Sequence, residues 1–157
     1  PVFGGVYKLC AVIKDGEIIP KIKVSENIEK VTNPGMKNLY RIYDKESGMA
    51  LGDIMTLVDE TLDPSQDLTI YHQMNYWKNK TIPKGSYELR DLLVPIFIDG
   101  QLVYDCPSLA EVRAYSEKEL SHLWDEVKRF TYPQTYYVDL SRKLLDLKMK
   151  MLEEVPK

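Results

Sequence analysis

Two histidines carry the most versatile chemistry in this sequence, but neither stands in a catalytic context. A metal site built on His72 and His122 would need Asp or Glu ligands from elsewhere in the chain. His72 follows a predicted strand at 68–71, where a hydrogen-bonded structural role is expected. His122 lies off the apolar face of a predicted helix and is expected to be solvated. We therefore predict no catalytic residue and no metal site.

The other reactive residue types point the same way. No G-x-S-x-G motif, P-loop or G-x-G-x-x-G motif is present. The acidic pairs Asp59-Glu60 and Glu153-Glu154 direct their side chains apart in a strand or helix and are expected to be solvated. Cys10 and Cys106 lack metal-ligand spacing and are expected to be buried and reduced. Gly4-Gly5 could bring backbone amides near a phosphate, although a backbone constraint is the simpler explanation.

Composition narrows the class of protein. The 157 residues suffice for one domain, and 44% hydrophobic with 29% charged residues is ordinary for a globular chain. A net charge of −3, with both signs dispersed, lacks the basic patch of a nucleic-acid binder. No apolar stretch reaches the ~20 residues of a membrane span, and a cytoplasmic location fits best. Eleven Tyr against three Phe favour half-buried or docking surfaces.

Strand signals fill the first two thirds of the chain. Three hairpins are predicted, with strands at 6–13 and 17–24, at 39–43 and 50–58, and at 96–98 and 101–103. The first and last of these hairpins turn on Asp-Gly, a dipeptide that tolerates the positive φ of a tight turn. One further strand is expected at 68–71.

Helix signals fill the last third. S-x-x-E capping boxes at Ser108 and Ser116 predict the starts of two separate helices. Helical spacing predicts one apolar face made of Leu120, Leu123, Trp124 and Val127. A last helix is expected from near Ser141, with one face made of Leu144, Leu147 and Met151. The fold class predicted is α+β, a β-hairpin-rich N-terminal two thirds followed by a helical C-terminal third.

The start of the chain suggests a piece of a longer protein. Pro1 is neither an initiator Met nor part of a cleavage signal, and an apolar segment begins almost at once. If so, the separated chain is expected to expose apolar surface around residues 6–13 or on the last helix.

Three blocks of sequence, in this order, carry a family resemblance. Phe3–Leu9 is similar to a strand that follows a phosphate-binding loop. Pro20–Lys30 and Thr32–Lys37 match the next segment in order and spacing. Pro107–Arg113 and Tyr132–Ser141 are similar to a C-terminal helical end. Together they cover essentially the whole chain, which resembles the C-terminal portion of the nicotinate phosphoribosyltransferase family.

The resemblance implies a fragment of a larger barrel-containing enzyme. Such enzymes make nicotinate mononucleotide from nicotinate and phosphoribosyl pyrophosphate in NAD biosynthesis. They use Mg²⁺ and couple turnover to ATP hydrolysis, so they count as glycosyltransferases and as ligases. The family's phosphorylatable His, nicotinate-binding Arg and phosphate loop have no counterpart in this sequence, and neither does the four-cysteine zinc knuckle of some members. The chain alone is therefore expected to be inactive and to bind none of these cofactors.

The resemblance also divides the chain into three parts. Residues 1–13 would be a strand linking from the missing barrel, 14–107 a β-rich C-terminal domain, and 108–157 a helical C-terminal segment. Gly4, Gly5 and Lys8 stand nearest the missing loop and are the implied substrate-proximal residues.

The block from Lys21 to Lys37 has no chemistry that we can assign. Its lysines could face phosphates, but with Glu26 and Glu29 among them a solvated surface of mixed charge is favoured.

Two roles are compatible with these observations. The leading hypothesis is a structural or capping portion that packs on the N-terminal barrel of the same enzyme, within a homodimer, with neither nucleic acid nor membrane as partner. The alternative is an independent protein-interaction module with a Tyr-rich face and no enzymatic role.

Overall fold

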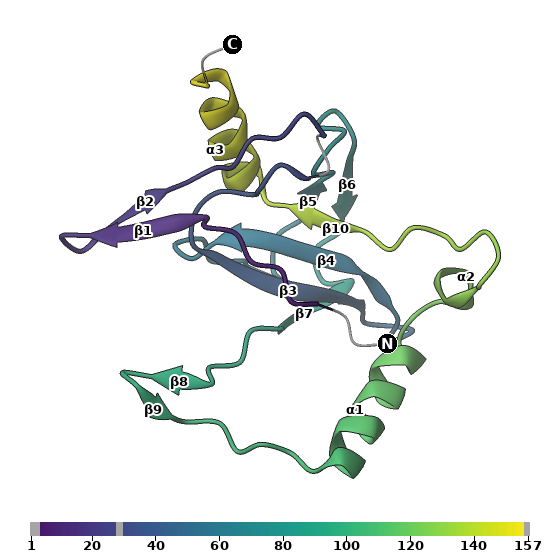
Figure 1. Ribbon diagram of the computed structural model, residues 1–157. Coiled ribbons are helices and arrows are strands. Elements are labelled where there is room, and N and C mark those ends of the chain that lie inside the picture. Colours follow the sequence, from purple (N-terminus) through teal and green to yellow (C-terminus); the bar gives the residue numbers. More distant parts are fainter. Residues whose placement is uncertain (1–3, 28–29, 156–157) are drawn as a thin grey trace.

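A six-stranded mixed sheet organises the chain, and a strand from the C-terminal third lies inside it (Figure 1). The computed structural model describes residues 4–27 and 30–155. Residues 1–3 of the predicted linking strand and residues 28 and 29 of the lysine block lie outside the described residues. The strands of the sheet are β3 (Lys37–Asp44), β4 (Ala50–Leu57), β5 (Leu68–Tyr71), β6 (Asn79–Ile82), β7 (Tyr87–Asp91) and β10 (Val138–Leu140).

Chain connectivity shows that this sheet is curled. The order is β6-β5-β10-β4-β3-β7, so β6 and β7 are the two edges. In a flat sheet, five spacings of about 4.8 Å would separate the edges by about 24 Å. However, the chain from Ile82 to Tyr87 spans at most about 18 Å. The edges must therefore approach each other, and the Tyr87 hydroxyl donates to the Gln66 carbonyl at 3.0 Å across the resulting interior.

The curl encloses the larger apolar core. Its buried members lie on the inner face of the sheet and are Ile42, Ile54, Leu68, Ile70, Ile82 and Tyr87. Burial of each large side chain of this kind stabilises the fold by roughly 1.5–3 kcal/mol.

Helix α3 (Arg142–Glu153) covers part of the outer face. Leu144 and Leu145 are buried there with Leu140, against Met55 and Leu57. The Ser141 hydroxyl caps the helix by accepting from the Leu144 amide, which confirms the predicted helix start. Because the sheet covers the apolar face of α3, the expected exposed apolar patch on the last helix is absent.

Two small hairpins project from this body. β1 (Ala11–Lys14) pairs with β2 (Glu17–Pro20) around Asp15-Gly16, and β8 (Phe97–Ile98) pairs with β9 (Gln101–Leu102) around Asp99-Gly100. In each turn both central residues have positive φ, as the Asp-Gly dipeptide requires.

The predicted N-terminal strand is longer than the observed one. β1 begins at Ala11 rather than at Val6. The observed strand is shorter because its partner β2 ends at Pro20, opposite Ala11. The Cys10 carbonyl accepts hydrogen bonds from the Lys21 and Gly35 amides. Val6 and Tyr7 are almost fully exposed.

The helical third departs from the prediction in two ways. Helix α1 (Leu109–Ser121) is one helix whose cap and capping box are made by Ser108, while Ser116 lies in its middle and starts nothing. The predicted apolar face from Leu120 to Val127 is broken, because α1 ends at Ser121 and the short α2 (Asp125–Lys128) follows. None of the helices among the described residues has the length and apolarity needed to cross a bilayer.

Three strands of the sheet were not predicted. β6 and β7 are edge strands with mostly polar residues, and β10 has three residues, too few for a periodic signal. The chain is mixed α and β, with a large mixed sheet and three helices in its described part. The predicted boundaries at 13/14 and 107/108 stay predictions, although residues 108–157 supply β10 to the sheet.

The two capping boxes differ in their expected effect on stability. Ser108→Ala removes a cap and should destabilise α1 by about 1 kcal/mol, whereas Ser116→Ala should be neutral or slightly favourable because Ala is the better helix former. Amide exchange across residues 109–121 measures this local stability. Equal exchange in the two variants would contradict the assignment of Ser108 as the cap.

Candidate functional site

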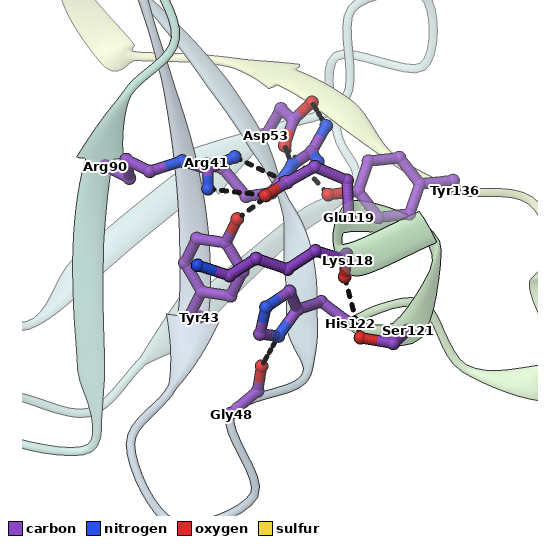
Figure 2. Close-up of polar contacts among 10 residues, drawn as sticks. All are labelled: Arg41, Tyr43, Gly48, Asp53, Arg90, Lys118, Glu119, Ser121, His122 and Tyr136. Carbon is purple, nitrogen blue, oxygen red and sulfur yellow. Dashed lines mark hydrogen bonds and ion pairs between the residues drawn. The ribbon is translucent and has the colours of Figure 1, made fainter. Parts of the chain in front are cut away.

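The most connected polar cluster starts with an ion pair on the outer face of the sheet (Figure 2). Arg41 on β3 and Asp53 on β4 are register partners, so their side chains lie on the same face. Arg41 donates from Nε and Nη2 to the two Asp53 oxygens at 2.9 and 3.2 Å. The Tyr136 hydroxyl donates to Asp53 Oδ1 at 2.8 Å, and the Arg41 guanidinium lies 5.7 Å from the Tyr136 ring centroid. These contacts orient the Arg41 and Asp53 side chains without the participation of any helix.

Glu119 brings α1 onto this pair. Its carboxylate accepts from Arg41 Nη1 at 3.1 Å, from Arg90 Nη1 at 2.7 Å and from the Tyr43 hydroxyl at 3.2 Å. Arg90 on β7 is the register partner of Arg41, so the two neighbouring strands β3 and β7 present polar side chains to one carboxylate (Figure 2). We call the six residues Arg41, Tyr43, Asp53, Arg90, Glu119 and Tyr136 the Arg41 network.

His122 makes a second tie between α1 and the sheet. Its Nδ1 lies 2.8 Å from the Gly48 carbonyl, which fixes Nδ1 as the protonated nitrogen. Its backbone carbonyl accepts from the Ala50 amide at 2.8 Å, and its ring meets Tyr43 edge-on. The expectation of a solvated His122 is therefore wrong, because the helix ends there and turns the ring onto the β3–β4 loop.

The pKa values of Arg41, Glu119 and Tyr136 in the Arg41 network are shifted away from neutral pH. Hydrogen bonding from Arg90 lowers the pKa of Glu119 to about 2, against the smaller opposing effect of burial. The hydrogen bond to Asp53 raises the pKa of Arg41, and burial raises the pKa of Tyr136. A general acid or base works best with a pKa near the working pH, so these groups are suited to holding structure and not to proton transfer.

The predicted substrate-proximal residues lie away from the Arg41 network. Gly4 and Gly5 are exposed, and a Cβ on either would meet nothing within 4 Å. The Lys8 ammonium donates to the Lys30 carbonyl at 2.7 Å on the surface. The described part of the chain does not bring these residues together with any other reactive group, and their substrate-proximal role stays a prediction.

Other sequence expectations have mixed outcomes. His72 has the hydrogen-bonded role expected, since its Nδ1 accepts from the Met74 and Asn75 amides at 3.1 Å. Glu60 is not solvated, because its carboxylate accepts from the Leu57 amide and the Ser141 hydroxyl.

Both cysteines are free, but the expectation that they are buried is wrong, because Cys10 is partly exposed and Cys106 is exposed. Within residues 4–27 and 30–155, no three His, Cys, Asp or Glu side chains gather closely enough to hold a metal ion.

Sequence reasoning missed the Arg41 network. One signal was available: Asp53 is a charged residue inside an otherwise apolar strand, and such a charge needs a partner when buried. The S-x-x-E pattern assigns Glu119 to a helix cap. Nothing local indicates that it contacts Arg41, which is 78 positions away, and Arg90, which is 29 positions away.

The fold and this network define a mixed α/β domain whose central charges neutralise one another. The family model that matches residues 36–148 is described as the nicotinate phosphoribosyltransferase C-terminal domain. A nicotinate phosphoribosyltransferase of Bacillus subtilis is 37% identical over 155 residues, and one of Homo sapiens is 35% identical over 153 residues. The crystal structure of human nicotinic acid phosphoribosyltransferase matches 77% of this chain and 24% of its own, with a TM-score of 0.64 and 29% identity.

The chain therefore belongs to the nicotinate phosphoribosyltransferase family and corresponds to its C-terminal domain. It spans 31% of the Bacillus subtilis relative and 26% of the human relative.

Glu119 makes the attachment of α1 dependent on pH. Its folded pKa of about 2 lies below the ordinary 4.5, so its stabilisation is present above pH 4.5 and is lost as pH falls toward 2. At neutral pH, Glu119→Gln should weaken protection of the α1 amides by about 2–3 kcal/mol relative to wild type. The difference between the two proteins should vanish near pH 2.

A matched control lies on the same helix. Glu117 is exposed, and Glu117→Gln should leave amide exchange in α1 unchanged at every pH. Equal protection of α1 in wild type and Glu119→Gln at pH 7 would rule out the proposed anchoring.

Proposed function

We propose that this chain serves as the C-terminal part of an enzyme that makes nicotinate mononucleotide from nicotinate and phosphoribosyl pyrophosphate in NAD biosynthesis. Family membership over residues 36–148 carries this proposal. The enzyme would use Mg²⁺ and couple turnover to ATP hydrolysis, in a cytoplasmic homodimer. The relatives that are similar to it in sequence are named nicotinate phosphoribosyltransferase.

The part played by this chain would be structural, capping a barrel that lies elsewhere in the enzyme. Loss of pyrophosphate from the anomeric carbon develops positive charge on the sugar and negative charge on the leaving group. Stabilising both requires a metal ion and unpaired cationic or amide donors. The arginines of the Arg41 network are already neutralised by Asp53 and Glu119, so they are unsuited to clamp phosphates.

Gly4, Gly5 and Lys8 are the residues of this chain that we place closest to substrate. They precede β1 on an exposed segment, and among the described residues the Lys8 ammonium donates to a surface carbonyl. A lysine in that situation can exchange its partner for a phosphate at small cost.

Exposed apolar side chains support a docking role. One group precedes or lies in β1 and includes Val6, Tyr7, Leu9 and Ile13. The other lies on the excursion 92–137 between β7 and β10 and includes Phe97, Leu109, Phe130 and Tyr132. Single exposed apolar residues are ordinary, but this many on two segments favours surfaces that are covered in the whole enzyme.

The first test of this role is enzymatic. Incubated with nicotinate, phosphoribosyl pyrophosphate, Mg²⁺ and ATP, the chain should form no nicotinate mononucleotide, because the groups that stabilise the departing pyrophosphate lie elsewhere. The full-length Bacillus subtilis relative is the positive control. Turnover by the chain at a rate comparable to that control would overturn the structural role.

The second test concerns docking. The chain should self-associate with increasing concentration, or bind the N-terminal part of the enzyme supplied in trans, as measured by sedimentation velocity. Phe130→Ser combined with Tyr132→Ser should weaken this association, since both side chains are almost fully exposed. Lys84→Ser on the β6–β7 turn is the control.

A chain that stays monomeric and does not bind the N-terminal part would instead favour an independent interaction module.

A further inference from the structure

A pocket of about 430 Å³ opens at the inner face of the sheet, beside the loop that joins β5 and β6. No residue of the Arg41 network lines it, and neither do Gly4, Gly5 or Lys8. Its walls combine apolar side chains with a buried acid and exposed lysines, and its size falls in the range of small-molecule sites.

Strand register brings its polar residues together. Ile70 is the register partner of Lys80, and Leu140 is the partner of Tyr71. Because side chains alternate between faces, Ile70, His72, Lys80 and Asp139 all lie on the inner face. The pairing of β10 with β5 thus places an acid from the C-terminal third beside a histidine and a lysine from the β5–β6 hairpin.

Asp139 is the unusual member of this group. It is only 7% exposed, yet its carboxylate makes no hydrogen bond or ion pair with any residue in the described part of the chain. Burial raises the pKa of its carboxyl group. An acid buried without a partner destabilises a fold, so its position on a pocket wall suits a group that accepts hydrogen bonds from a ligand.

The other lining residues define the rest of the ligand. His72 uses Nδ1 to accept from two backbone amides, which leaves its proton on Nε2. Trp77 is 75% exposed, and its ring offers a stacking surface at the mouth, with Tyr137 on the wall. Lys78 and Lys80 are exposed and lie at the rim. The ligand should carry hydrogen-bond donors at its inner end, a flat aromatic group and an anionic outer end.

We propose that this pocket binds a nucleoside monophosphate. Ribose hydroxyls donate to the Asp139 carboxylate, as they do to acidic residues in other nucleotide sites. The base stacks on Trp77, and the phosphate lies against Lys78 and Lys80. This proposal rests on the lining of the pocket alone and does not depend on the function proposed above.

Adenosine monophosphate is a direct probe, and Trp77 is its reporter. The sequence has two tryptophans, so Trp124→Phe leaves Trp77 as the single indole fluorophore. Titration of this variant with adenosine monophosphate should quench its fluorescence saturably, because the base stacks on the indole. Adenosine should bind at least about tenfold more weakly, since it lacks the charge that the lysines recognise.

Substitutions in the pocket provide the decisive comparison. Asp139→Asn should weaken binding of adenosine monophosphate at least about tenfold, and Lys80→Ala should weaken it several-fold. Lys84→Ala, on the nearby turn outside the pocket, should have no effect. Asp139→Asn should also melt at or above the wild-type temperature, because it removes a buried charge that lacks a partner. If Asp139→Asn fails to fold, the Lys80→Ala and Lys84→Ala pair decides the outcome.

Three results would overturn the proposal. One is the absence of saturable quenching up to about 10 mM adenosine monophosphate, where even a weak site fills. Another is equal affinity for adenosine and adenosine monophosphate. The third is binding that Lys80→Ala leaves unchanged, which would place the nucleotide elsewhere on the surface.

Discussion

The pairing of β10 holds the sheet of this domain together. β4 and β5 follow each other in the chain but are not neighbours, because β10 lies between them, parallel to β4 and antiparallel to β5. Without those three residues the sheet would divide into β6-β5 and β4-β3-β7. Leu140 is fully buried, and the next residue, Ser141, continues the backbone pairing to the Met55 carbonyl at 2.9 Å. The start of α3 and the shape of the inner face both depend on this pairing.

The approach to β10 also sets the geometry of the Arg41 network. The Asp53 amide donates to the Tyr137 carbonyl at 2.9 Å, which fixes the backbone beside the network. Gly52 makes this approach possible: its φ is 147°, and a Cβ there would lie 3.1 Å from the Tyr137 carbonyl oxygen. Residues 92–137 leave the sheet at the edge strand β7 and return to its interior at β10 (Figure 1). This segment includes α1, which Glu119 anchors to the outer face of the sheet.

The two long helices are attached by different physical means. α3 buries Leu144 and Leu145, whereas α1 buries none of its residues and is held by Glu119 and His122. Attachment by polar groups leaves the apolar side chains of α1 and its flanking segments exposed. That difference supports the docking role proposed above, in which a domain with its own core offers one surface to another part of the enzyme.

Local chemistry was sufficient to predict features that depend on a few adjacent residues: the Asp-Gly turns, the Ser108 cap and the helix start at Ser141. The family was predicted differently, by the resemblance of three ordered blocks to known sequences. Local sequence was insufficient wherever a partner distant in the chain decides the structure. β10 is too short to carry a periodic signal and is a strand only because β4 and β5 flank it. Glu119 fits a capping motif, yet it binds arginines from two strands, because tertiary folding offers it stronger, charged donors. The pairing of strands and of buried charges was decided by the tertiary structure, since the free energy of each contact depends on both partners and on their burial.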